Sequence, residues 1–194
     1  LRKAFEAFKK QGFSAEYKAF TAKEDYWLED YALFEAIKED SSDRAWYEWE
    51  DGLKRRQPEE LRKVRERLAD EADFHKFLQY HFHRQWRRLK EYAKECGIKI
   101  MGDMPIFVSH DSVDVWTHQH LFKLNPDGTA KTVAGVPPDY FSATGQLWGN
   151  PQYDWTAMMK DGYAWWKSRF KKLAEQVDII RIDHFRGFES YWEV

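Results

Sequence analysis

The sequence predicts an α/β fold in which a helical first half precedes an alternation of helices and strands. Residues 1–97 carry apolar side chains at three- and four-residue intervals almost throughout. After Gly97, two short β-rich runs at 98–108 and 178–184 alternate with a helix. This order is typical of parallel strands joined by right-handed crossovers. A doubly wound sheet and a (β/α)₈ barrel both fit, and in both the chemistry gathers where the strands end.

The first half is predicted to consist of amphipathic helices. An apolar stripe runs along residues 23–40, made by Trp27, Leu28, Tyr31, Phe34 and Ile37. Pro58 is typical of the first position of the next helix. A third helix over 70–96 ends at Gly97 and carries a stripe of Phe74, Phe77, Leu78, Phe82, Trp86, Leu89 and Ala93.

The second half begins with a strand and continues into a long irregular stretch. Because Pro105 cannot donate to a sheet, Asp103 should lie near the end of the strand at 98–108. Residues 109–151 show no usable period, apart from a hairpin signal around Asn-Pro-Asp-Gly. The stretch is rich in aromatic side chains, and loops of this length in compact domains are usually functional or disordered, so we expect an ordered functional loop. One helix over 154–176 then leads into the second strand.

The second strand, in the motif RIDHFRG, ends in charged residues. Side chains alternate along a strand, so Arg181 and Asp183 should share one face while Ile180 and Ile182 pack under helices. A neighbouring guanidinium favours the charged form of a carboxyl group, so we expect Arg181 to hold Asp183 ionised. Such a carboxylate can act as a nucleophile, a metal ligand or an oxocarbenium stabiliser. An ion pair that merely closes the strand is the alternative, but two further polar residues in the motif favour function.

Composition narrows the class of protein. The formal net charge of −2 gives no support for a nucleic-acid or membrane-surface partner, and no apolar run approaches the ~20 residues of a membrane span. The single cysteine, Cys96, excludes an intramolecular disulfide and fits a cytoplasmic location. Aromatic residues make up 18% of the chain, including ten Trp, which fits either a well-filled core or a carbohydrate cleft. The terminal residues, Leu1 and Val194, suggest a piece of a larger protein.

Three blocks resemble one enzyme family. RIDHFRGFESYWEV, GDMPIFVSHDSVDVW and VAGVPPDYFSATGQLWGNPQYDW are similar, in the same order, to segments of the 4-α-glucanotransferases of glycoside hydrolase family 77. The resemblance implies part of a (β/α)₈ TIM barrel with 98–108 and 178–184 as its third and fourth strands. It also implies a helical subdomain at 1–69 and a partial catalytic domain at 70–194, which includes the loop at 109–151.

The resemblance also implies roles for individual residues. Asp183 matches the nucleophile that forms a covalent glucosyl-enzyme in a retaining double displacement, and Arg181 matches the arginine beside it. The substrate-binding residues implied are Asp103 and His184 at the donor sugar, with Tyr140, Phe141, Trp148 and Asn150 in the acceptor loop. The implied partners are α-1,4-glucans, maltooligosaccharides and glucose, with no cofactor and no metal. The family's general acid/base comes from a later strand, so we expect residues 1–194 alone to be inactive.

Three other functions fit parts of the sequence. An α-amylase-like or debranching hydrolase shares the nucleophile strand, and a non-catalytic glucan-binding module would account for the Trp content. A metal-dependent α/β enzyme could use Asp103, His110, Asp111 and Asp114. The motif PPDYFSATGQLWGNP favours the transferase over the α-amylase-like or debranching hydrolase.

Overall fold

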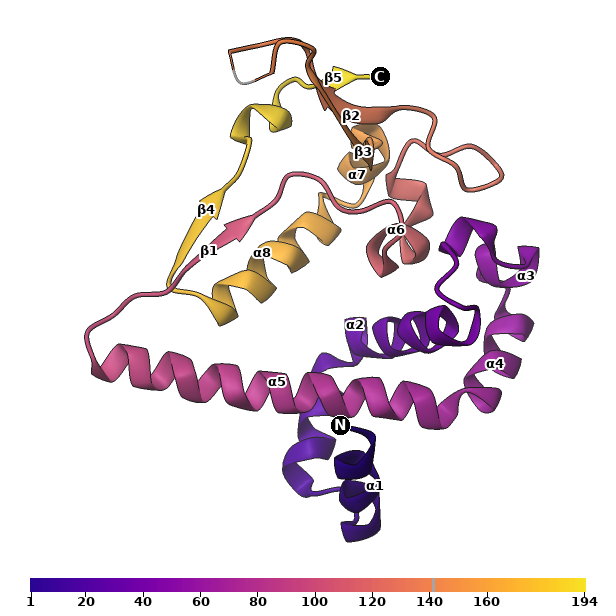
Figure 1. Cartoon of the computed structure of the whole chain (residues 1–194), viewed down its shortest axis with the longest axis vertical. Helices are drawn as coiled ribbons and strands as arrows, with labels where there is room; N and C mark the ends of the chain where they lie inside the picture. The colour runs from indigo at the N-terminus through magenta and orange to yellow at the C-terminus, as the bar shows by residue number, and fades with distance from the viewer. Residues whose placement is uncertain (141) are drawn as a thin grey trace. The chain divides into compact units, whose positions relative to one another are not determined.

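The computed structural model describes residues 1–140 and 142–194, and the chain divides into two compact units, Leu1–Arg88 and Leu89–Val194. The first unit is helical and the second is mixed α/β (Figure 1). Phe141, expected in the acceptor loop, lies outside the described residues. The expected domain boundary between residues 69 and 70 stays a prediction.

The first unit confirms the helices expected from apolar periodicity. Its elements are α1 (Arg2–Gln11), α2 (Ala15–Asp40), the 3₁₀ turn η1 (Trp46–Glu48), α3 (Asp51–Lys54), α4 (Pro58–Arg67) and the first part of α5 (Ala69–Glu95). Ser14 caps α2, since its hydroxyl accepts the Tyr17 N–H at 3.1 Å. Pro58 occupies the first turn of α4, as its fixed φ favours.

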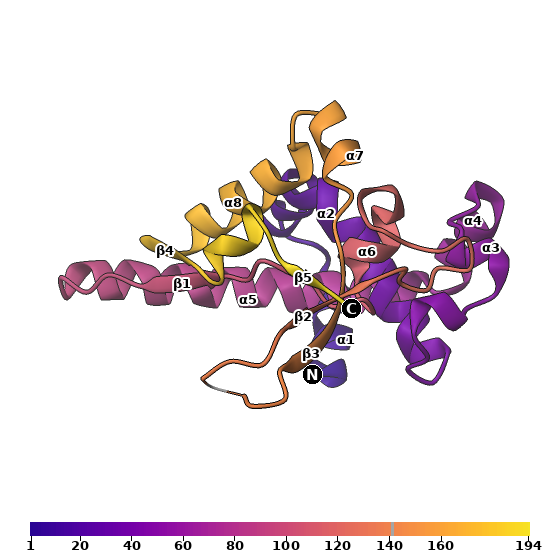
Figure 2. The ribbon, with the colours of Figure 1, turned by 90° about the horizontal axis from the view of Figure 1, so that it is seen from above.

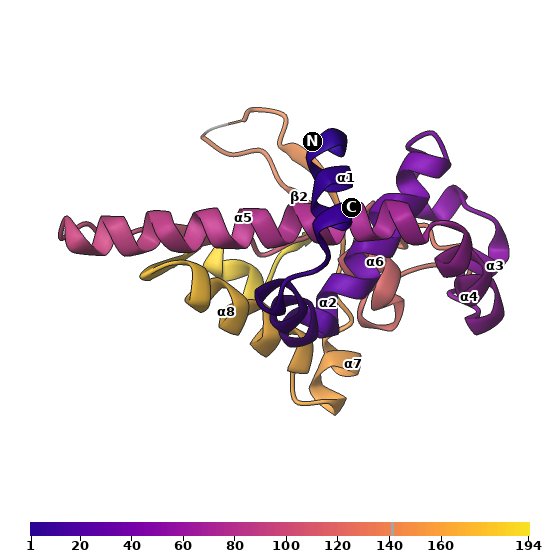
Figure 3. The ribbon, with the colours of Figure 1, turned by 90° about the horizontal axis from the view of Figure 1, so that it is seen from below.

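Aromatic rings form the core of this unit. Phe5 of α1 is fully buried, with its ring 5.5 Å from Phe74 and 5.4 Å from Phe77 of α5. Tyr17 of α2 meets Tyr80 of α5 edge to face at 5.2 Å, and Figure 3 shows α1 and α2 lying across α5. The apolar stripe predicted for α5 is therefore buried in its first turns. Farther along the helix, Phe82 and Leu89 are about half exposed.

The second unit contains the predicted parallel strand pair. Strand β1 (Met101–Met104) pairs in parallel with β4 (Ile179–Ile182), and α8 (Ala164–Gln176) lies along the pair (Figures 1 and 2). Both strands are shorter than predicted, and β1 ends immediately before Pro105, which has no N–H to donate.

Close packing against α8 distinguishes the two faces of this pair. A Cβ on Gly102 would lie 2.7 Å from Val177 Cγ1, so only glycine allows the helix end to approach β1 this closely. Ile180 pairs with Gly102 and is half-buried on the same face. Met101 and Ile179 face the other way and are exposed. The predicted alternation along β4 is confirmed.

Part of the stretch 109–151 is regular, which corrects the expectation that it has no helices or strands beyond a hairpin. It contains α6 (Val113–Thr117), η2 (Gln119–Leu121), β2 (Val133–Val136) and β3 (Gln146–Pro151). Strand β2 pairs antiparallel with β3 on one side and with β5 (Trp192–Glu193) on the other. The predicted hairpin is present as a single bridge between Leu124 and Ala130 around the Asn-Pro-Asp-Gly turn.

The single helix predicted over 154–176 is also wrong. The segment forms α7 (Trp155–Lys160) and α8, separated by residues 161–163, of which Gly162 and Tyr163 have φ of 66° and 62°. This left-handed backbone cannot continue a right-handed helix. The Asp161 carboxylate accepts the Ala164 N–H at 3.1 Å and so starts α8.

The core of the second unit surrounds Tyr153, which is fully buried. Its ring lies 5.2 to 5.9 Å from the rings of Phe107, Phe122, Trp165 and Trp166. Much of the aromatic content is therefore core, although Trp148 and Trp192 remain exposed. None of the helices among residues 1–140 and 142–194 has the length and apolar composition needed to cross a membrane.

Candidate active site

An ion pair joins the ends of β1 and β4. Arg181 Nε donates to Asp103 Oδ1 at 2.7 Å and Nη2 donates to Oδ2 at 2.6 Å. The parallel register places these two residues opposite each other. The hydrogen bonds from Arg181 lower the pKa of Asp103, and Asp103 raises the pKa of Arg181 in return. Both side chains are exposed, so the pair orients two charged groups at an open strand edge.

Asp183 is the residue directly after β4, and a backbone hydrogen bond to the β1 side fixes its position. Its N–H donates to the Met104 carbonyl at 3.2 Å, which continues the β1–β4 pairing by one residue. The carboxylate attracts Arg181, and this raises the pKa of the guanidinium as the smallest of several contributions. The hydrogen bonds of Arg181 go to Asp103, so the partner expected for Arg181 differs from the one that the structure shows.

His184 turns the chain away from the sheet. It adopts φ 49°, a left-handed conformation, and begins the 3₁₀ turn η3 (Phe185–Phe188). Its ring lies 5.2 Å from Trp148 of β3, nearly perpendicular at 83°. The chain just after the end of β4 therefore contacts the sheet of β2 and β3. His184 and Trp148, predicted from separate sequence blocks, lie together.

The other predicted loop residues differ in their contacts and in their exposure to solvent. Asn150 Nδ2 donates to the Val108 carbonyl at 2.8 Å, so its amide ties β3 to the segment after β1. Trp148 Nε1 donates to Gln146 Oε1 at 2.9 Å, while the indole stays partly exposed. Tyr140 is 97% exposed. The structure thus gathers Asp103, Arg181, Asp183, His184 and Trp148 near one edge and gives Asn150 a backbone contact.

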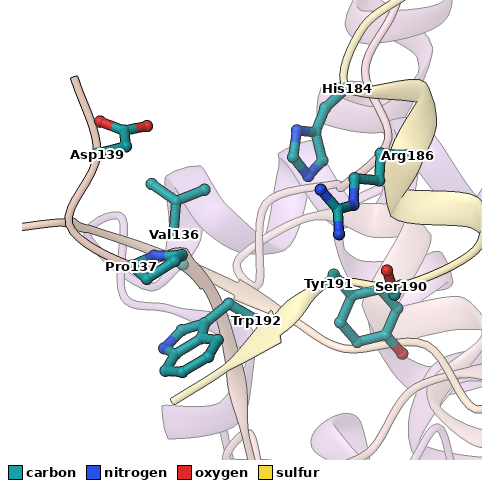
Figure 4. Close-up of a pocket in the computed structure, with 9 residues that line it drawn as sticks. Val136, Pro137, Asp139, His184, Arg186, Ser190, Tyr191 and Trp192 are labelled. Carbon is teal, nitrogen blue, oxygen red and sulfur yellow. The ribbon is translucent and has the colours of Figure 1, made fainter. Parts of the chain in front are cut away.

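A cavity of about 410 Å³ opens beside this edge (Figure 4). One wall is formed by the end of β2 and the residues after it, and the other by the segment 184–192, which comes after β4 in the chain. The lining residues are Gly135, Val136, Pro137, Asp139, His184, Arg186, Ser190, Tyr191 and Trp192. Figure 4 shows the His184 ring and the Arg186 guanidinium pointing into the space between the walls. Its volume lies within the ~300–1,000 Å³ of small-molecule sites.

The lining chemistry suits a hydroxylated ring. The Trp192 indole is 56% exposed and offers a flat apolar face. Arg186 supplies hydrogen-bond donors, and Asp139 supplies acceptors from the opposite wall. The sequence-based site missed Asp139, Arg186 and Trp192 as pocket residues. Arg186 stands in the RIDHFRG motif itself, whereas Trp192 joins the site only because β5 pairs with β2.

Two of the residues considered for a metal site, His110 and Asp114, make contacts within the second unit instead. His110 Nε2 lies 2.8 Å from the Gly128 carbonyl, and burial lowers the pKa of His110. Asp114 Oδ1 accepts the indole N–H of Trp165 at 3.3 Å. Within the part of the chain that the structure describes, no group of three or more His, Cys, Asp or Glu side chains is arranged to hold a metal ion.

Comparison with known proteins gives one consistent result. The family model described as 4-alpha-glucanotransferase, glycoside hydrolase family 77, matches residues 1–194. The 4-alpha-glucanotransferases of Synechocystis sp. and Thermus thermophilus are 49% and 48% identical to the whole chain. The chain spans 39% of the length of each.

A solved structure agrees. The amylomaltase from Streptococcus agalactiae, solved in complex with acarbose, matches all of this chain and 39% of its own with a TM-score of 0.94 at 44% identity. A family match over the whole length, together with a fold match at this level, shows that the chain belongs to the 4-alpha-glucanotransferases of glycoside hydrolase family 77.

Proposed function

We propose that the complete protein is a 4-α-glucanotransferase, which moves a segment of an α-1,4-glucan to the 4-hydroxyl of glucose or a maltodextrin. The observation that carries the proposal is the family match over all 194 residues, with the RIDHFRG motif at the carboxyl end of a parallel strand. The S. agalactiae relative in complex with acarbose supports a site of the same kind. A cytoplasmic location is part of the proposal.

The proposed fold is a (β/α)₈ TIM barrel in which β1 and β4 are the third and fourth strands. Its support is the parallel pair with α8 on one face and the apolar side chains of Met101 and Ile179 exposed on the other. In a closed barrel this second face would line the packed interior. Residues 1–69 would be the helical subdomain and 70–194 part of the catalytic domain.

The proposed reaction is a retaining double displacement at Asp183. The Asp183 carboxylate attacks C1 of the donor sugar, the C1–O4 bond breaks, and the leaving O4 takes a proton from a general acid. The acceptor 4-hydroxyl then attacks C1, gives its proton back to that group, and Asp183 is released. Retention requires this second carboxyl group ~5 Å from the nucleophile, and we propose that it comes from the longer protein, after Val194.

The other site residues bind and orient the two sugars. Arg181, fixed by Asp103, places positive charge near Asp183. His184 and Asp103 would hydrogen-bond the donor sugar. Tyr140, Phe141, Trp148 and Asn150 belong to the proposed acceptor loop, and the cavity beside Trp192 and Arg186 offers room for an acceptor ring. Aromatic walls that exclude water favour transfer to a sugar over hydrolysis.

The test is disproportionation of maltotriose by the complete protein. We expect glucose and longer maltodextrins with little growth in total reducing ends. Asp183→Asn should abolish the products, while Glu189→Gln, a matched change six residues along the same segment, should leave the turnover unchanged. Reducing ends that rise with each bond broken would indicate a hydrolase. Residues 1–194 alone should release no glucose, and release that Asp183→Asn abolishes would contradict the proposed division of the acid and the nucleophile.

A further inference from the structure

Two side chains outside the site hold consecutive backbone carbonyls just after β1. The Tyr153 hydroxyl donates to the Ile106 carbonyl at 2.7 Å. Arg169 Nη2, from α8, donates to the Pro105 carbonyl at 3.2 Å. No strand pairing serves these carbonyls, since β1 ends at Met104. Ile106 is buried, so its carbonyl needs a partner within the protein, whereas Pro105 lies at the surface.

Both donors are themselves rigidly held. The Arg169 guanidinium lies over two indole rings, 4.9 Å from the centroid of Trp165 and 4.6 Å from that of Trp166. Tyr153 is fully buried among aromatic rings. Burial raises the pKa of Tyr153 well above its usual range, against a smaller lowering by Arg169, so the phenol keeps its proton and donates it.

The segment Met104–Ile106 contacts the chain at Asp183 and again in the turn after Asp183. The Met104 carbonyl, one residue before Pro105, accepts the Asp183 N–H at 3.2 Å. The Ile106 side chain packs so tightly on the turn after Asp183 that a Cβ on Gly187 would lie 3.0 Å from Ile106 Cγ1. The segment from Met104 to Ile106 therefore links the two donors to Asp183 and to the turn that follows it.

We propose that Tyr153 and Arg169 are positioning residues for the transfer reaction, which fix the Pro105–Ile106 carbonyls and thereby the backbone that holds Asp183. The inference rests on the proposed function of Asp183. A nucleophile must be held within a fraction of an ångström of its productive position, and supporting hydrogen bonds behind the site supply that precision. Neither residue is among those that line the cavity.

The experiment uses the complete protein and an α-maltosyl fluoride donor. Fluoride leaves with little help from a general acid, so the release of fluoride in the first turnover reports the attack by Asp183. Tyr153→Phe removes one hydroxyl and keeps the ring. Arg169→Met removes the guanidinium, Arg169→Lys restores charge and one donor, and Lys171→Met is the matched control on the exposed side of α8.

We expect Tyr153→Phe to slow the first turnover roughly ten-fold with KM unchanged, short of the ~100-fold that a 1 Å misplacement can cost. Arg169→Met should show a similar loss, Arg169→Lys a smaller one, and Lys171→Met none. Thermal melting identifies the temperature range in which every variant is folded, and rates are compared there. If the two residues only stabilised the fold, folded variants would keep the wild-type kcat. A lower kcat with an unchanged KM in folded protein therefore indicates positioning.

Two outcomes separate the inference from the proposed function. If the wild type releases fluoride, Asp183→Asn abolishes it, and Tyr153→Phe and Arg169→Met both turn over like the wild type, the positioning role is overturned and the function stands. If Asp183→Asn turns over like the wild type, the proposed function fails and the inference fails with it.

Discussion

At the residue scale, the Asp103–Arg181 pair acts through geometry more than through stability. Both side chains are exposed, and exposed ion pairs contribute little to the free energy of folding. The two parallel hydrogen bonds nevertheless fix the plane of the guanidinium, which a single contact would not do. Arg181 is therefore held in a defined position two residues before Asp183.

This pair predicts a titration. Arg181 lowers the pKa of Asp103, so Arg181→Gln should raise that pKa toward the ordinary value of about 3.9. A pKa that is lower in the folded state adds stability above the unfolded-state value, and this stability is lost as the pH falls through the folded-state pKa. The side-chain carboxyl chemical shift of Asp103, followed by NMR from pH 2 to 6, gives the Asp103 pKa in the wild type and in Arg181→Gln.

The matched control is Arg186→Gln, which removes a guanidinium from the same motif without touching Asp103. Its Asp103 titration should equal that of the wild type. An Asp103 pKa that does not move in Arg181→Gln would show that the bidentate pair does not form in solution.

The sequence predicted the face of Arg181 but not its partner. Alternation along one strand is a local property, so placing Arg181 and Asp183 on the same face needed only the residues of β4. The hydrogen bonds cross to Asp103, 78 residues away, because the parallel register sets those two residues opposite each other. Register depends on how distant strands pair, and no local pattern in this chain specifies it.

At the scale of elements, Gly102 controls the approach of α8 to the strand pair. Its Cβ position is occupied by Val177 and bordered by Leu173 at 3.4 Å. The helix end can therefore pack directly on the backbone of β1. The same contact sets the distance between the helix and the β1–β4 pair, and so helps to position the ends of the two strands.

Filling this space should destabilise the unit. Gly102→Ala should lower the free energy of unfolding by roughly 1–3 kcal/mol, as overpacking commonly does. Val177→Ala removes the methyl group that the new Cβ meets, so the double variant should lose less than the sum of the two single variants. Urea unfolding of all four proteins measures this coupling, and additive losses would mean that Gly102 does not contact Val177.

The elements inside 109–151 could not be predicted for a physical reason. Strands β2 and β3 are short and contain Gly, Pro and Asn, which are poor strand formers. Strand β2 is the middle strand because the distant β5 pairs with it. The break between α7 and α8 depends on Tyr163 in a left-handed conformation, which few non-glycine residues adopt. By contrast, α5 and the parallel β1–β4 pair followed from long periodicity and from element order.

At the scale of the whole molecule, the described candidate site lies within the unit Leu89–Val194. The family match nevertheless extends over all 194 residues, which span 39% of the length of the curated relatives. The central claim is that this unit carries the nucleophile of a glucan-transferring enzyme. A chemical label on that nucleophile tests it without depending on any other assignment.

The measurement is mass mapping of the complete protein after reaction with a 5-fluoro-α-maltosyl fluoride, whose glycosyl-enzyme turns over slowly. We predict one 5-fluoromaltosyl adduct, on the peptide that contains Asp183, and no adduct at Asp103 or in Asp183→Asn. An adduct on a different carboxylate, or transfer activity that proceeds while Asp183 stays unlabelled, would contradict the account.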